Sequence, residues 1–509
     1  LSPSPSPAPA KLAAERTYPY FPDAATQLPV WNDAEPPFDL AEFLKAPPDE
    51  ENAAPLYIDA LFEFGSELAI CYCLPGEDPQ GETIRRAEAA RERYQEYERL
   101  EEARRKDPGS ADKTDVDAWL AQYDVGFQKL SAAQQRPRCV FQTGLNFDSL
   151  LPHSNVARQV ARVVKWRTRR DLERGDFQRP IHDLETVLRL SRDLRRRGVE
   201  VSQLVSIAVD GISCQQLVPE ILAAPAIQTQ HCDRLLALLV EHETKAIDPF
   251  LEANRAWYFM DRQILHDLQH RTGSLDPQYM KEELEVKGDV NSPMACIALL
   301  IQFDAIGSPL AAEKYGALPG GSRPPGGADA PTLPLLPNAF SGGKMLADDD
   351  YVKEVDALNR VYASILALAD QPNHPRLGDF ETVVAPLREP LRETTLAVFL
   401  VSQNQSGLMS AILRAEATLR GTQCLVALRR WQLQHAELPQ DLDALVKDAG
   451  MPGVPIDPYS DQPLRMTVID GKPVIYSVGL DAKDDKALSD WQYGQQPGDF
   501  IFRLEPPSD

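Results

Sequence analysis

The chain has 509 residues, and its 76 Asp and Glu against 53 Lys and Arg give a formal net charge of -23. At roughly 100 to 200 residues per domain, this length allows about three units or one elongated helical array. So large an acidic surplus repels phosphate backbones and anionic lipid, which argues against nucleic acid or a bare membrane surface as a partner. The longest apolar stretch, Met294–Ile301, falls far short of the roughly 20 residues that span a bilayer, so we expect no transmembrane segment.

Residues 1–54 are rich in proline and aromatic side chains, and we predict that they form an extended arm over the body. Residues 1–10 alternate proline with small side chains, which neither continue a helix nor join a sheet, because proline lacks an amide donor and fixes φ. We interpret them as the tether that follows a removed signal segment, which predicts an exported protein in the periplasm, on the envelope or outside the cell. The alternative is a chain boundary in a cytosolic protein.

The seven cysteines are few, odd in number and widely scattered, which is not the pattern of a disulfide framework. Most lie in apolar helical contexts, where a thiol behaves as a small hydrophobic group. Cys71 and Cys73 have no second Cys or His pair nearby, so they are a weak signal for a metal.

Residues 55–306 are predicted to be a helical body. Glu82–Lys106 alternates Glu and Arg at helical neighbour distances and is expected to be a helix exposed on most sides. Between Asn155 and Lys245, apolar stripes alternate with short breaks, which predicts stacked antiparallel helical hairpins. The turn Leu172–Phe177 resembles the helix-to-helix turn of tetratricopeptide-type repeats, over one repeat only. The fold is therefore predicted to be mainly α, with repeat-like hairpins.

A long break follows the body, because residues 307–345 are loaded with Gly and Pro and are either disordered or a functional loop. Residues 346–410 are predicted to continue the helices, with Pro390 suited to a first turn. A long helix lying along a partner helix is then predicted by apolar residues that recur every seven positions, namely Ile412, Leu419, Val426 and Leu433.

Residues 411–509 are predicted to end in a small antiparallel β-sheet. Leu464–Val468 and Pro473–Ser477 flank Asp470-Gly471, which is a strong hairpin signal. Phe500–Leu504 is a third strand by the same alternation of side chains.

The order of motifs in this last unit carries a family resemblance. The long helix is followed by Glu437-Leu438-Pro439, Ile456-Asp457-Pro458-Tyr459, Ser477-Val478-Gly479-Leu480-Asp481 and Gly498-Asp499-Phe500. Over roughly residues 411–504 this is similar to the globular domain of type II secretion major pseudopilins. The Pro-rich start, helical middle and this tail together resemble large exported helical proteins of planctomycete-type bacteria.

In the pseudopilins, the loop after the Ser-x-Gly-x-Asp segment binds calcium, which prefers six to eight hard oxygen ligands. The resemblance implies a Ca²⁺ site here, with ligands from Leu480 (its carbonyl), Asp481, Asp484, Asp485 and Asp499, and with Asp490 in the same loop. Two departures weigh against it, because Ala482 and Lys483 replace expected glycines and Lys486 adds a positive charge. The alternative is a solvated acidic loop without metal.

The resemblance stops at the start of the long helix. A pseudopilin begins with a membrane helix, whereas residues 411–433 are amphipathic, so we do not expect this protein to polymerise as a pilus subunit.

Three other groups are candidates for a site. His266 and His270 are four residues apart on one helix face, a spacing that can hold zinc, but the Glu of a metalloprotease motif is missing and a surface pair is favoured. The basic stretch Arg158–Arg197 favours intramolecular ion pairs on a solvated face over an acidic partner. Asp348–Asp350 could ligate a cation, yet acidic residues also favour a helix start.

These observations lead to a first hypothesis, a non-enzymatic exported scaffold that binds a protein partner. The second is an enzyme, hydrolase-like, with its site around Asp261, His266 and His270; it predicts a deep pocket whose carboxylates or histidines have strongly shifted pKa values. The third is an accessory of a secretion system, on the strength of the C-terminal unit alone.

Overall fold

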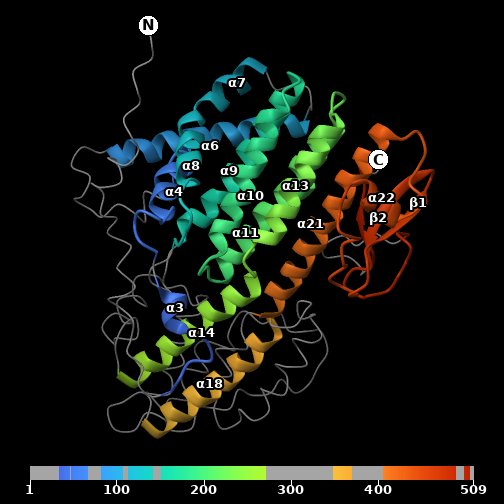
Figure 1. Ribbon diagram of the computed structural model, residues 1–509. Coiled ribbons are helices and arrows are strands. Elements are labelled where there is room, and N and C mark those ends of the chain that lie inside the picture. The colour runs from blue at the N-terminus through green and yellow to red at the C-terminus, as the bar shows by residue number, and fades with distance from the viewer. Residues whose placement is uncertain are drawn as a thin grey trace, which may run out of the picture.

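The computed structural model describes residues 34–45, 47–66, 82–106, 113–141, 151–270, 348–369, 405–488 and 498–504. This part of the chain is mainly α-helical, with stacked antiparallel helical hairpins and a small antiparallel sheet near the C-terminal end, as the sequence predicts (Figure 1). Its first helices are α3 (Leu40–Leu44), α4 (Ala54–Leu61), α6 (Glu82–Lys106), α7 (Lys113–Ala121), α8 (Asp124–Ala133), α9 (Pro152–Glu173), α10 (Gln178–Arg195) and α11 (Glu200–Ile212). They are followed by the π-helical turn η1 (Ser213–Leu217), α12 (Val218–Ala223), α13 (Thr229–Lys245), α14 (Pro249–His270), α18 (Asp348–Ala369), α21 (Gln405–Gln434) and α22 (Leu442–Asp448).

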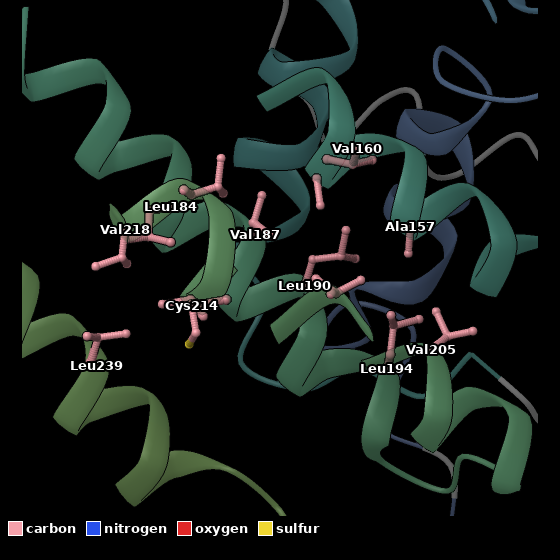
Figure 2. Packing of buried hydrophobic residues seen from close by; sticks show 14 of the residues in the cluster. Ala157, Val160, Leu184, Val187, Leu190, Leu194, Val205, Cys214, Val218 and Leu239 are labelled. Carbon is pink, nitrogen blue, oxygen red and sulfur yellow. The ribbon is translucent and has the colours of Figure 1, made fainter. Parts of the chain in front are cut away.

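The centre of the body is formed by α9, α10 and α11, which pack on one another. Pro152 lies in the first turn of α9, where its missing amide donor costs nothing. Gly175 has a φ of +76° and turns the chain from α9 into α10. Figure 2 shows the buried side chains of these helices meeting between the ribbons, among them Ala157, Val160, Val187 and Leu190. The predicted hairpins between residues 155 and 245 are therefore confirmed.

A left-handed cap ends α10 at Arg197, whose φ is +54°. This side chain is 2% exposed, and burial lowers the pKa of its guanidinium to about 10. Its Nε donates to the carbonyl of Phe43 at 3.2 Å, and its backbone N–H donates to the Glu252 carboxylate at 2.6 Å. The cap thus ties α10 to both α3 and α14.

Helix α21 runs along α13 (Figure 1). Of the apolar residues at seven-residue spacing, Ile412 and Val426 are buried, Leu419 packs at the edge of the core and Leu433 is 37% exposed. The expectation of a long helix with a partner is confirmed, and the partner is α13.

The N-terminal helices enclose an aromatic cluster in which Phe64 stacks on Tyr123 and meets Phe127 edge-on. Gly126 on α8 is required here, because a Cβ at this position would lie 2.6 Å from the Phe64 ring. The charged helix α6 is attached at Glu63, whose carboxylate lies 2.9 Å from Arg86. Most of the other α6 side chains are exposed or half-buried, as its composition predicts.

The sheet has the strand order β1 (Arg465–Ile469), β2 (Lys472–Ser477) and β3 (Phe500–Phe502), all antiparallel. Asp470 and Gly471 both have positive φ, at +51° and +75°, which is the two-residue hairpin that their sequence predicts. The sheet packs on α21. The contact is close, because a Cβ on Gly421 would lie 2.5 Å from the ring of Phe502.

Several predictions fall outside the described residues: residues 1–33 of the arm predicted over residues 1–54, the Gly/Pro stretch 307–345, Pro390, Cys71, Cys73 and Cys296. The cysteines that the structure does describe are buried free thiols, which agrees with a hydrophobic role. No helix in the described ranges has both the length and the apolar character needed to cross a bilayer.

Candidate functional site

The basic stretch Arg158–Arg197 is engaged by carboxylates of the same chain. Arg167 meets Asp183 with atoms 2.5 Å apart, and its guanidinium lies 3.3 Å from the centroid of the Phe127 ring. Burial raises the pKa of Asp183, although Arg167 acts in the opposite direction. Further pairs join Arg169 to Glu220, Arg170 to Asp117, Arg179 to Asp171 and Arg195 to Asp210. The predicted intramolecular ion pairs are present, but the Arg167 and Arg195 pairs are buried between helices rather than on a solvated face.

A buried cluster of the same kind is centred on Asp210 of α11. Arg195 of α10 donates to one carboxylate oxygen, and Nε2 of His242 on α13 lies 3.2 Å from the other. Burial alone would raise the pKa of Asp210, but His242 and Arg195 together lower it to about 2. Since His242 is 1% exposed, this cluster joins three helices and offers nothing to a ligand from outside.

A second polar cluster lies between α14 and α18, which pack side by side (Figure 1). The Tyr362 hydroxyl donates to Oδ2 of Asp261 at 2.7 Å. Both side chains are 0% exposed, and burial raises the pKa of Asp261 to about 7 while the bond from Tyr362 opposes the rise. The same seam contains Tyr258–Asn359 and Arg262–Tyr351 hydrogen bonds, each of 2.8 Å. Sequence reasoning named Asp261 but had no signal for its partner on α18.

The structure describes the side chain of only one of the two candidate histidines. His266 is half-buried on α14, whereas the side chain of His270 lies outside the described residues. The aromatic run just upstream belongs to the core, since Tyr258, Phe259 and Met260 are buried. Asp348–Asp350 open α18, as the helix-start interpretation predicts, and Asp348 accepts from Gln269 at 2.9 Å.

The predicted calcium loop folds against the outer face of the sheet. Asp499 is buried and its carboxylate accepts the backbone N–H groups of Asp485 at 3.4 Å and Ala487 at 2.6 Å. Burial raises the pKa of Asp499, and the nearby charges of Asp485 and Asp484 add to the rise. The structure therefore brings three of the predicted ligands into one neighbourhood.

The carboxylates of Asp484 and Asp481 also accept hydrogen bonds from groups outside this neighbourhood. Asp484 accepts from the Tyr476 hydroxyl at 3.1 Å, and Asp481 accepts from the backbone N–H of Lys483 at 3.2 Å. The side chain of Leu480 is 41% exposed, and Asp490 lies outside the described residues. Within the described ranges, no three His, Cys, Asp or Glu side chains are grouped as a metal ion needs. In this arrangement the loop is closed by Asp499 and backbone amides, and the calcium site stays a prediction.

A buried carboxylate, Asp457, organises the C-terminal unit through several hydrogen bonds, which the sequence did not indicate. Asp457 is 1% exposed and accepts from the Ser477 hydroxyl at 2.8 Å and from the N–H groups of Tyr459 and Val478 at 3.0 Å each. It joins the loop before β1 to the end of β2. The Ile-Asp-Pro-Tyr segment is part of the family resemblance, but no residue pattern around it predicts that its carboxylate is buried.

Exposed apolar side chains are concentrated near the C-terminus. Six of the eleven large hydrophobic side chains that stand exposed in the described part of the chain lie between residues 433 and 488: Leu433, Leu438, Ile456, Val468, Leu480 and Leu488. Leu488 is 81% exposed, next to the acidic loop. Single exposed hydrophobic groups are ordinary, whereas a contiguous apolar patch marks an interaction site.

Comparison with known proteins finds no matching family model, no matching curated protein and no matching solved structure.

Proposed function

We propose that this protein is a non-enzymatic scaffold that binds a protein partner through the apolar side chains exposed between Leu433 and Leu488. The observation that carries the proposal is their concentration on the C-terminal unit, away from the ion-paired body. The same proposal takes the protein to be exported or attached to the envelope, with a pseudopilin-like unit that binds calcium.

The edge of the sheet supports this choice of surface. In a two-residue hairpin the residues next to the turn form a hydrogen-bonded pair, so Thr467 bonds to β2 while the backbone groups of Met466 and Val468 point away from it. No described residue supplies a backbone partner on that side, and Val468 is 52% exposed. An edge of this kind can accept an extended segment of another protein.

The polar clusters of the body favour a structural role over catalysis. A catalytic group has to reach its substrate, yet Asp261, Tyr362 and His242 are at most 1% exposed. The shifted pKa of Asp261 favours the enzyme hypothesis, but the shift comes from burial in a closed helix seam. The accessory role in a secretion system differs from our proposal only in the identity of the partner.

The proposal is tested by crosslinking in the native envelope, followed by mass spectrometry. We expect crosslinks from the unit between Leu433 and Leu488, and we expect Val468→Lys and Leu488→Lys to reduce recovery of the same partner at least tenfold. Ile84→Lys is the matched control, because Ile84 is 59% exposed on α6. Equal recovery with all three variants, or crosslinks confined to the helical body, would overturn the proposal.

A further inference from the structure

Helix α18 is attached to the described body mainly through one seam with α14. Its buried face carries Val355, Leu358, Val361 and Ile365. Hydrogen bonds between described side chains cross the seam at Asp348–Gln269, Tyr351–Arg262, Asn359–Tyr258 and Tyr362–Asp261. Anything that weakens the polar contacts acts directly on the attachment of α18.

The contact at Asp261 is incomplete as a carboxylate site. Tyr362 donates to Oδ2, while Oδ1 is buried and receives no hydrogen bond from any described residue. An ionised carboxylate has lone pairs for about four hydrogen bonds, so one donor leaves it far from satisfied. A protonated carboxyl carries no charge and needs much less from its surroundings.

Among the residues that the structure describes, no cation compensates for a negative charge on Asp261. The neighbouring Arg262 on α14 donates to the Tyr351 hydroxyl, with its guanidinium 5.4 Å from the centre of that ring. Facing groups on α18 are Tyr351, Glu354 and Tyr362, and Tyr258 on α14 is engaged with Asn359. Among the described residues, including those of α11 and α21 that also pack on α14, only Tyr362 acts on the proton equilibrium of Asp261.

We propose that protonated Asp261 is a latch that holds α18 on α14, and that loss of its proton to solvent loosens this seam. With the proton in place, Asp261 accepts from Tyr362 as a neutral group inside an apolar seam. Without the proton, Asp261 is a buried anion whose one hydrogen bond comes from a hydroxyl. Opening of the seam then becomes more favourable, because water reaches the carboxylate and solvates its charge. The inference concerns the helical body and does not depend on the partner proposed above.

The direction of the pH effect and its pH range follow from the linkage between proton binding at Asp261 and opening of the seam. In the closed seam the pKa of Asp261 is about 7, whereas an exposed Asp titrates near ~3.9. Between these values the closed state holds a proton that the open state has lost, so each pH unit raises the opening equilibrium about tenfold. The seam is tightest below about pH 4, loosens up to about pH 7 and changes little above that.

Hydrogen exchange of α18, followed by mass spectrometry on peptides within residues 352–366, tests the latch. The ratio of the wild-type rate to the rate of Asp261→Asn at the same pH removes the intrinsic pH dependence of exchange. We expect this ratio to rise about fiftyfold between pH 5 and pH 7, because the closed state is itself half-deprotonated at pH 7. A ratio that changes less than threefold would overturn the proposal.

Two more variants keep the test decisive. Asp356→Asn removes an exposed carboxylate from the same helix and should keep the wild-type pH dependence. Tyr362→Phe removes the single hydrogen bond to the carboxylate, so the rise in exchange should continue beyond pH 7. If Asp261→Asn does not fold, Tyr362→Phe decides: a rise that ends at the wild-type pH overturns the proposal, as does loss of the pH dependence in Asp356→Asn.

Discussion

Replacing Asp210 by Asn should destabilise the protein more than any exposed charge substitution, because Asp210 is the only anion that contacts both Arg195 and His242 among the described residues. Asn keeps the size of the side chain and removes the charge. Arg195, 7% exposed, would then hold a buried cation without its counter-ion.

The magnitude follows from the structure in two ways. The pKa of Asp210 is held at about 2, against ~3.9 for an exposed Asp, and this difference corresponds to about 2–3 kcal/mol in favour of the ionised form. Removing one partner of a buried ion pair costs about 3–5 kcal/mol in other proteins. We therefore expect a loss of about 2 to 5 kcal/mol at pH 7. Because the folded pKa is lowered, this stabilisation is present above about pH 4 and is lost as the pH falls toward 2.

Urea unfolding at pH 7, followed by circular dichroism, measures the loss. Asp233→Asn is the matched control, since Asp233 pairs with Arg430 but is 52% exposed, and it should cost less than about 1 kcal/mol. The double variant Asp210→Asn with Arg195→Met should recover part of the stability, because it removes the stranded cation. A loss below about 1 kcal/mol for Asp210→Asn would show that the cluster is not the buried counter-ion system described above.

Two further predictions concern the C-terminal unit. Gly421→Ala should cost about 1–3 kcal/mol, because its methyl group meets the Phe502 ring, whereas Gly407→Ala on the same helix has open space and should be neutral or stabilising in urea unfolding. Stoichiometric Ca²⁺ should remain after dialysis without chelator, and its removal by chelator should lower the melting temperature of the wild type but not of Asp499→Asn; absence of bound Ca²⁺ and an unchanged melting temperature would contradict the implied site.

Elements with a strong period were predictable from the sequence. The stripe Val156, Val160, Val163 and Val164 predicts α9, and all four side chains are 1% exposed or less. Asp470-Gly471 predicts the β1–β2 hairpin because both residues accept positive φ. In each case the information lies within a few residues of the element that it determines.

The short helix α3 was missed although a local signal exists. Asp39 caps it by accepting the N–H of Glu42 at 2.9 Å, and an acidic residue three positions after an Asp is typical of a helix start. The prolines on either side of this segment predict an extended arm instead of a helix. The position of α3 is fixed by Arg197, which lies 154 residues after Phe43 in the chain and donates a hydrogen bond to its carbonyl.

The partners of the buried charges could not be predicted, because the sequence does not say which helix faces meet. Arg170 is 53 residues from Asp117, and Tyr362 is 101 residues from Asp261. Asp261 looks like an ordinary helical carboxylate until α18 covers it. Burial then changes its chemistry, since it raises the pKa to about 7. The latch is therefore a property of the packing rather than of any motif.

Because many arginines form ion pairs inside the body, the surface is left acidic, and this limits which partners the proposed contact surface can bind. Each guanidinium paired inside the body, as at Arg167 and Arg195, is withdrawn from the surface, while the chain keeps a net charge of -23. Between Leu433 and Leu488 there are ten acidic and five basic side chains, and all but the buried Asp457 are exposed or half-buried. A partner with an apolar centre and a basic rim matches both properties, whereas an acidic partner is repelled before the apolar groups meet. Because rim charges act mainly on the association rate and are screened by salt, we expect the basic rim to set how fast the partner docks and the apolar centre to set how long it stays.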